Sequence, residues 1–68
     1  MPISVIVNDQ SVEVPSNYTV TQLLQQLALR GGPVAVERNQ QLVPTPEQSL
    51  TTLKNGDCLE IVSLTGGG

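Results

Sequence analysis

The chain has 68 residues and a net charge of −3, from three basic and six acidic side chains, so it is long enough for one small domain. Tyr18 is its only aromatic residue. The core must therefore be built from Val, Leu and Ile, which leave no large slot for a cofactor. The three cations form no basic stripe, and this argues against nucleic-acid binding.

No apolar run approaches the length that spans a bilayer, so no membrane segment is predicted. No basic-then-apolar leader precedes the first expected strand, so no secretory signal is predicted either. Cys58 is the only cysteine, which rules out an intrachain disulfide. Together these observations predict a cytoplasmic location.

The N-terminal segment predicts a β-hairpin. Residues 3–7 are rich in β-branched apolar side chains, residues 8–10 carry turn-forming side chains, and residues 11–14 alternate between polar and apolar. Alternation places Ile6 on the outer face, opposite four inward-facing valines: Val5, Val7, Val12 and Val14.

A helix is expected from about Val20 to Leu29. Thr19 precedes it as an N-cap, and Gln22 three residues later completes a capping-box pattern. Gly31-Gly32 is the expected stop, and Pro33 prevents continuation. One apolar stripe at helical spacing faces the core, formed by Val20, Leu23, Leu24 and Leu27, while Gln22, Gln25 and Gln26 take the solvent side.

The second half predicts three more strands and an irregular connection. The strands are expected at 34–37, 42–43 and 58–62, with turns at 38–41 and at Asn55-Gly56-Asp57. Residues 45–53 lack a clean period and predict a loop with one short helical turn, from which Leu50 and Leu53 plug the core. In the last strand, Leu59 and Ile61 share one face, and Cys58, Glu60 and Val62 share the other.

This order of elements predicts an α+β fold, a mixed sheet of four to five strands with one main helix packed on one face. Parallel pairing of the last strand with the first would place the last strand centrally, as in a β-grasp arrangement. The division expected is a β-grasp domain over residues 1–63 and a flexible C-terminal glycine tail over 64–68.

Independent catalysis is disfavoured. Histidine is absent, which removes the commonest general base and metal ligand, and one cysteine alone makes neither a zinc site nor a cysteine–histidine nucleophile. The six carboxylates are scattered over turns and strand surfaces and are interpreted as solvated charge. For Cys58, a structural or incidental role is expected, because no cation is placed to activate the thiol.

The C-terminal glycines are the feature of the sequence that most directly suggests a chemical function. Gly66, Gly67 and Gly68 form a slender stalk that ends in a carboxylate, although a frayed terminus is the alternative interpretation. Adenylation by ATP would turn that carboxylate into an acyl donor, which a sulfur nucleophile could then take over. Leu64 is the expected last anchored side chain, and five extended residues from there reach roughly 16 Å into a partner's active site.

An ordered set of fragments carries a family resemblance over nearly the whole chain: Asn8-Asp9-Gln10, Thr19-Val20 with Leu23-Leu24, Val34–Glu37 with Asn39 and Leu42–Pro44, Leu53–Asp57, and Gly66–Gly68. This set resembles the ThiS family, the sulfur carrier proteins of thiamine biosynthesis. The turn Asn39-Gln40 departs from the Asn-Gly of many relatives, and Arg38 departs from the small apolar residue that often precedes it. Both departures lie outside the C-terminal glycine segment that would react.

The resemblance implies a ubiquitin-like β-grasp fold and a protein cosubstrate, not an enzyme. Gly68 would be adenylated and converted to a thiocarboxylate that donates sulfur for thiazole formation. Gly66 and Gly67, with Thr65 and Leu64, would thread the partner site. ATP would bind the partner, and no cofactor or metal would bind this chain. The implied partners are an adenylating enzyme, thiazole synthase and a sulfur-donor protein.

A docking surface is expected on the sheet face that the helix leaves open, with Ile6, Val62 and Leu42 as its apolar residues. Glu60 and Asp57 are candidates to steer this face toward a basic surface, with simple solubility as the alternative. When free, the protein is expected to be a monomer.

Other functions stay open at this point. Within sulfur carriers they are the small subunit of molybdopterin synthase, which is usually longer, and carriers for cysteine synthesis or RNA thiolation. A ubiquitin-like modifier would pass the same acyl group to a lysine. A non-covalent β-grasp interaction module would not depend on its last residue.

Overall fold

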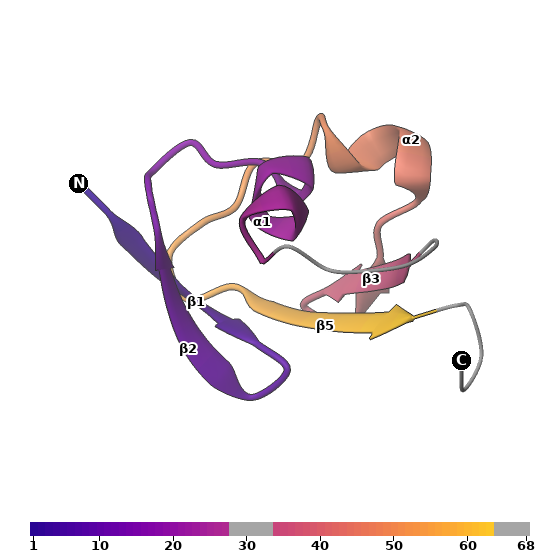
Figure 1. Cartoon of the computed structure of the whole chain (residues 1–68), viewed down its shortest axis with the longest axis horizontal. Coiled ribbons are helices and arrows are strands. Elements are labelled where there is room, and N and C mark those ends of the chain that lie inside the picture. The colour runs from indigo at the N-terminus through magenta and orange to yellow at the C-terminus, as the bar shows by residue number, and fades with distance from the viewer. Residues whose placement is uncertain (28–33, 64–68) are drawn as a thin grey trace.

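The structure is a computed structural model and describes residues 1–27 and 34–63 (Figure 1). Two helices and five strands follow one another along these residues. They are β1 (Ile3–Val7), β2 (Gln10–Val14), α1 (Val20–Gln26), β3 (Val34–Arg38), β4 (Gln41–Leu42), α2 (Thr45–Gln48) and β5 (Cys58–Ser63).

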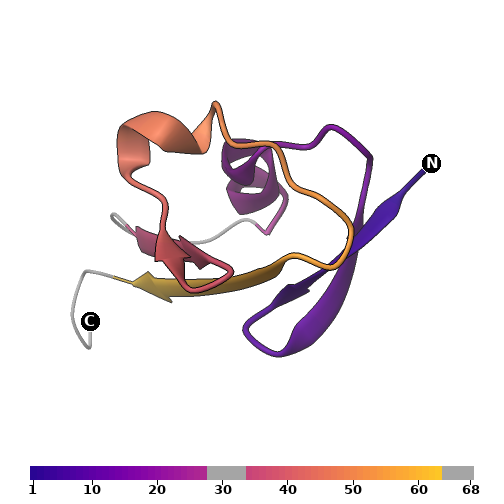
Figure 2. The same cartoon turned by 180° about the vertical axis from the view of Figure 1, so that it is seen from behind.

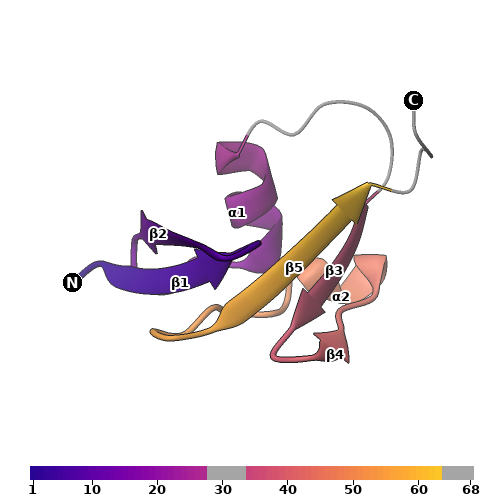
Figure 3. The same ribbon diagram turned by 90° about the horizontal axis from the view of Figure 1, so that it is seen from below.

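The strands form one mixed sheet in the order β2-β1-β5-β3-β4. β5 is parallel to β1 and antiparallel to β3, and each outer strand pairs antiparallel with its neighbour. Figure 3 shows β5 running between β1 and β3. The predicted α+β fold, with a mixed sheet, one main helix and the last strand parallel to the first, is therefore confirmed.

Two-residue turns close both hairpins. Asn8 and Asp9 have φ values of 48° and 71°, and Asn39 and Gln40 have 53° and 71°. Positive φ at both central positions is the signature of a type I′ turn, whose twist matches that of the flanking strands. Gln40 thus stands in a conformation that glycine adopts more easily, which is the local consequence of the Asn39-Gln40 departure noted in the sequence.

Helix α1 covers one face of the sheet (Figures 1 and 2). Its predicted capping box is present: the Gln22 amide donates to Thr19 Oγ1 at 3.2 Å, and the Thr19 amide donates to Gln22 Oε1 at 2.9 Å. The helix ends at Gln26, earlier than the predicted Leu29, because Leu27 is already the C-cap. The predicted stop at Gly31-Gly32 and Pro33 lies outside the described residues.

The core lies between α1 and the sheet, and apolar side chains from every strand except β4 reach it. The predicted inward faces are confirmed, since Leu59 is buried and Ile6 exposed. Val12 is partly buried and packs against the core. The buried apolar residues are Val5, Val7, Val14, Val20, Leu23, Val36, Val43, Leu53 and Leu59.

The segment between β4 and β5 corrects one prediction. Leu53 is 2% exposed and plugs the core as expected, but Leu50 is 79% exposed. The predicted helical turn is α2, and it buries Gln48, whose Nε2 donates to the Val43 carbonyl at 3.4 Å. Residues two apart point to nearly opposite sides of a helical turn, so burying Gln48 directs Leu50 to solvent.

The two leucines give a matched test of this packing. Leu53→Ala should lower the free energy of unfolding by about 2–4 kcal/mol, because it removes buried methyl groups and leaves a cavity. Leu50→Ala should change that free energy by no more than about 0.5 kcal/mol. Urea denaturation followed by circular dichroism measures both, and equal losses would contradict the packing.

Candidate functional site

Strand β5 is the structural base of the candidate site, because it leads directly into the residues that carry the predicted chemistry. Those residues, Leu64, Thr65, Gly66, Gly67 and Gly68, lie outside the described residues, so their predicted roles stay predictions. The division into a domain over 1–63 and a tail over 64–68 likewise stays a prediction. The structure describes how β5 is held and which surface surrounds it.

On the β1 side, an asparagine side chain extends the pairing of β5. Backbone pairing between the two strands covers Ile6 with Cys58 and Val7 with Leu59. Beyond it, the Asn8 amide nitrogen of the backbone donates to the Leu59 carbonyl at 2.9 Å. The Asn8 side chain then accepts from the Ile61 amide at 2.9 Å and donates to the Ile61 carbonyl at 3.2 Å. β1 ends at Val7, so the Asn8 side chain supplies the two hydrogen bonds to Ile61 that a longer β1 backbone would otherwise make.

On the β3 side, Asn39 does the same at the start of β5. Its backbone amide donates to the Cys58 carbonyl at 2.7 Å, and its Oδ1 accepts from the Cys58 amide at 3.0 Å. Both asparagines have positive φ, a conformation that their short polar side chains tolerate. Two turns on opposite sides of the sheet thus fasten β5 through side-chain amides.

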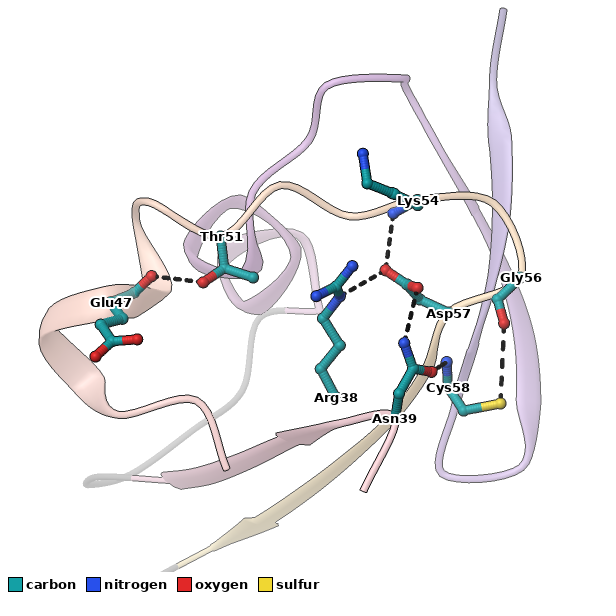
Figure 4. A network of polar contacts seen from close by, with 8 residues as sticks. All are labelled: Arg38, Asn39, Glu47, Thr51, Lys54, Gly56, Asp57 and Cys58. Carbon is teal, nitrogen blue, oxygen red and sulfur yellow. Dashed lines mark hydrogen bonds and ion pairs between the residues drawn. The ribbon is translucent and has the colours of Figure 1, made fainter. Parts of the chain in front are cut away.

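Asp57, immediately before β5, is the hub of the polar network in Figure 4. Its Oδ2 accepts from Arg38 Nε at 2.8 Å and from the Lys54 backbone amide at 2.8 Å. Its Oδ1 accepts from Asn39 Nδ2 at 3.1 Å. The Asp57 side chain is 7% exposed and the Arg38 side chain 27%. The network joins the β3–β4 turn to the turn that starts β5.

Burial by itself would raise the pKa of Asp57. The hydrogen bonds from Arg38, Lys54 and Asn39, together with the Arg38 charge, outweigh burial and hold that pKa below its ordinary value. The carboxylate is therefore ionised and fully engaged inside the protein. The hypothesis that Asp57 steers a partner is wrong for this reason: its charge is already paired with Arg38 and buried.

The three predicted docking residues all lie exposed. Ile6, Val62 and Leu42 are 40%, 57% and 64% exposed, and alternation places them on the face away from α1. In register, Leu42 lies opposite Glu37, and Glu37 lies opposite Glu60, so two glutamates sit between the apolar side chains. Sequence reasoning missed this glutamate pair, because it exists only once β3 and β5 are aligned.

Cys58 is exposed, and its thiol donates a long hydrogen bond to the Gly56 carbonyl oxygen at 3.9 Å. Residues 1–27 and 34–63 hold no group of three or more metal-ligating side chains. Nor does any helix in that part of the chain have the length and apolarity needed to cross a membrane.

Comparisons with known proteins agree with one another. The ThiS family model matches residues 3–68. A thiazole synthase of Paramagnetospirillum magneticum is 36% identical over 63 residues, which cover 93% of this chain but only 19% of that protein. The sulfur carrier protein ThiS of Escherichia coli is 31% identical over 64 residues, which cover 94% of this chain and 97% of the carrier.

A solved structure is similar as well. The crystal structure of a thiamine biosynthesis protein, ThiS, from Geobacter metallireducens superposes with a TM-score of 0.81 and 30% identity. The superposition covers 97% of this chain and 100% of the other. The expected family resemblance and β-grasp fold are thereby confirmed.

Stability should fall in acid through Asp57. Its pKa is lowered on folding, so its stabilising contribution is present above the unfolded pKa of about 3.9 and is lost as pH falls through the folded pKa. Asp57→Asn should lower the free energy of unfolding at about pH 7 by about 1–3 kcal/mol and flatten its decline between about pH 5 and pH 2.

Asp9→Asn is the matched control, because Asp9 is an exposed turn residue with positive φ, which asparagine accepts. It should leave both the stability and its pH profile unchanged. Urea titrations across the pH range measure these quantities. An Asp57→Asn protein with an unaltered acid decline would contradict the role assigned to this carboxylate.

Proposed function

The chain belongs to the ThiS family, and from that membership we propose that it is a sulfur carrier for thiazole formation in thiamine biosynthesis. The observation that carries the proposal is the family match over residues 3–68, which includes the three terminal glycines. The sulfur carrier ThiS of Escherichia coli, matched over 97% of its length, supports the same function.

In the proposed chemistry, this chain supplies the carbonyl and its partners supply catalysis. An oxygen of the Gly68 carboxylate attacks the α-phosphorus of ATP on an adenylating enzyme, pyrophosphate leaves, and an acyl-adenylate forms. A sulfur nucleophile at the oxidation level of hydrosulfide then attacks the carbonyl carbon. AMP leaves, and a thiocarboxylate remains. A carboxylate is a poor acyl donor until oxide is replaced by AMP as the leaving group, which is why ATP is needed.

The described residues fit a protein that is acted upon. No metal-ligating cluster occurs among residues 1–27 and 34–63, and the most perturbed carboxylate, Asp57, serves a buried structural network. From the family resemblance, we propose that ATP binds the adenylating enzyme, and we propose no cofactor for this chain. The cytoplasm, which contains ATP, is the proposed location of the reaction.

Thiazole synthase is the proposed recipient of the sulfur. A protein of that name contains a stretch 36% identical to 93% of this chain, although the chain spans about a fifth of its length. A carrier-like segment within a synthase polypeptide supports a direct association between carrier and synthase. The sulfur donor is proposed to be a further protein that delivers sulfur to the acyl-adenylate.

Intact-mass spectrometry tests the chemistry. Incubation with the host's adenylating enzyme, ATP and sulfide should increase the mass by the difference between one sulfur and one oxygen. Deleting Gly68 should abolish the gain, since the new end lies one residue short of the reacting position. A gain that survives the deletion would count against Gly68 as the attachment site, whereas the absence of any gain in the full chain would favour a non-covalent module.

The docking role of Ile6, Val62 and Leu42 is proposed for the same partner enzymes. Val62→Asp should weaken binding of the adenylating enzyme by about tenfold or more, because a charge enters an apolar contact. Leu50→Asp is the matched control, since Leu50 is more exposed but lies outside the sheet. Calorimetric titration measures both; equal affinities would remove this face from the proposal.

A further inference from the structure

Two glutamates lie side by side on the open face of the sheet. Glu37 of β3 and Glu60 of β5 are directly opposite in register, and both are exposed. Like charges at opposite positions of an antiparallel pair destabilise the sheet. The arrangement therefore costs stability in the free protein.

No cation of the described residues neutralises this pair. Within 1–27 and 34–63, the one ion pair joins Arg38 to Asp57. Arg38 lies opposite Leu59, which is buried in the core, so alternation puts Arg38 on the face opposite to Glu37 and Glu60. Among residues 1–27 and 34–63, no ion pair therefore offsets the repulsion between the two carboxylates.

Exposed apolar side chains surround the glutamates. Leu42 lies opposite Glu37 on the outer side, and Val62 stands two residues beyond Glu60 on the same face of β5. Ile6 lies opposite Cys58, two residues before Glu60. We call the set of Ile6, Glu37, Leu42, Glu60 and Val62 the acidic–apolar face.

We propose that the acidic–apolar face docks on the adenylating enzyme, and that Glu37 and Glu60 together bind one basic side chain there. The inference rests on the proposed function, because it takes Gly68 as the reacting residue. Residues 64–68 follow Ser63 in the sequence, and five extended residues reach roughly 16 Å. An enzyme that acts on Gly68 must therefore contact the region around the end of β5, where Val62 lies.

The sign of the charge points to this partner. Two adjacent carboxylates complement a basic side chain, and complementary charges of this kind set the choice of partner at an interface. A second copy of this chain would bring the same glutamate pair to the contact and be repelled. A basic side chain placed between the carboxylates relieves their repulsion only in the complex. The repulsion that destabilises the free protein therefore favours binding.

This gives the glutamates opposite effects on stability and on binding, which an ordinary structural or solubilising role would not. Glu37→Gln and Glu60→Gln should each raise the melting temperature by about 2–4 °C, because they remove the cross-strand repulsion. Each should also raise the KM for the carrier about three- to fivefold in ATP-dependent pyrophosphate release, with kcat unchanged.

Glu37→Lys sharpens the test, since lysine at that position pairs with Glu60 within the sheet. It should be the most stable variant and should raise KM more than tenfold. Glu47→Gln is the matched control: it removes the same charge from an exposed residue of α2. That change should leave KM within about twofold of the wild-type value, because Glu47 lies outside the proposed contact.

Salt provides a second readout. Raising ionic strength should raise the KM of the wild-type carrier, whereas the Glu37→Gln/Glu60→Gln double variant should respond much less. Equal KM values for the wild type and every variant would overturn the docking inference while leaving sulfur transfer intact. A wild-type dimer that the double variant disrupts would overturn it in favour of self-association. Absence of any pyrophosphate release by the wild type would instead overturn the proposed function.

Discussion

The central placement of β5 is the constraint on which the rest of the molecule depends. Its backbone pairs with β1 at only two positions, so the parallel contact that defines the fold is short. The Asn8 side chain lengthens that contact to Ile61, and Asn39 secures the opposite edge at Cys58. Side-chain amides thus complete a ladder that the backbone begins, and they hold the strand that precedes residues 64–68.

The register of β5 decides which side chains a partner can meet. Leu59 and Ile61 face α1, whereas Cys58, Glu60 and Val62 face away from it. A slip of one residue would exchange these two sets, exposing the core side chains and burying a glutamate. The Asp57 network lies immediately before the first residue of the strand and ties it to the β3–β4 turn, so it protects the register as well as the stability.

A protein that only presents a carbonyl needs few chemical groups of its own. In the proposed reaction, ATP bound to a partner supplies the driving force, and the carrier contributes recognition and reach. Such a division would require no histidine general base from this chain, and its sequence contains none. It also explains why the chemically telling features of the described residues are surface features: exposed apolar side chains and uncompensated glutamates on one face of the sheet.

Much of this protein could be read from its amino-acid order, because the signals are local. Alternation over residues 3–14 determined the hairpin faces, Thr19 and Gln22 determined the helix start, and Asn55-Gly56-Asp57 determined the turn before β5. Leu50 was misplaced because burial in an irregular segment depends on how the helical turn of α2 is oriented. Two facts came only from tertiary structure: the engagement of Asp57 by Arg38, and the meeting of Glu37 with Glu60. Both join residues about twenty positions apart, and no local pattern encodes which of them the folded sheet will bring into contact.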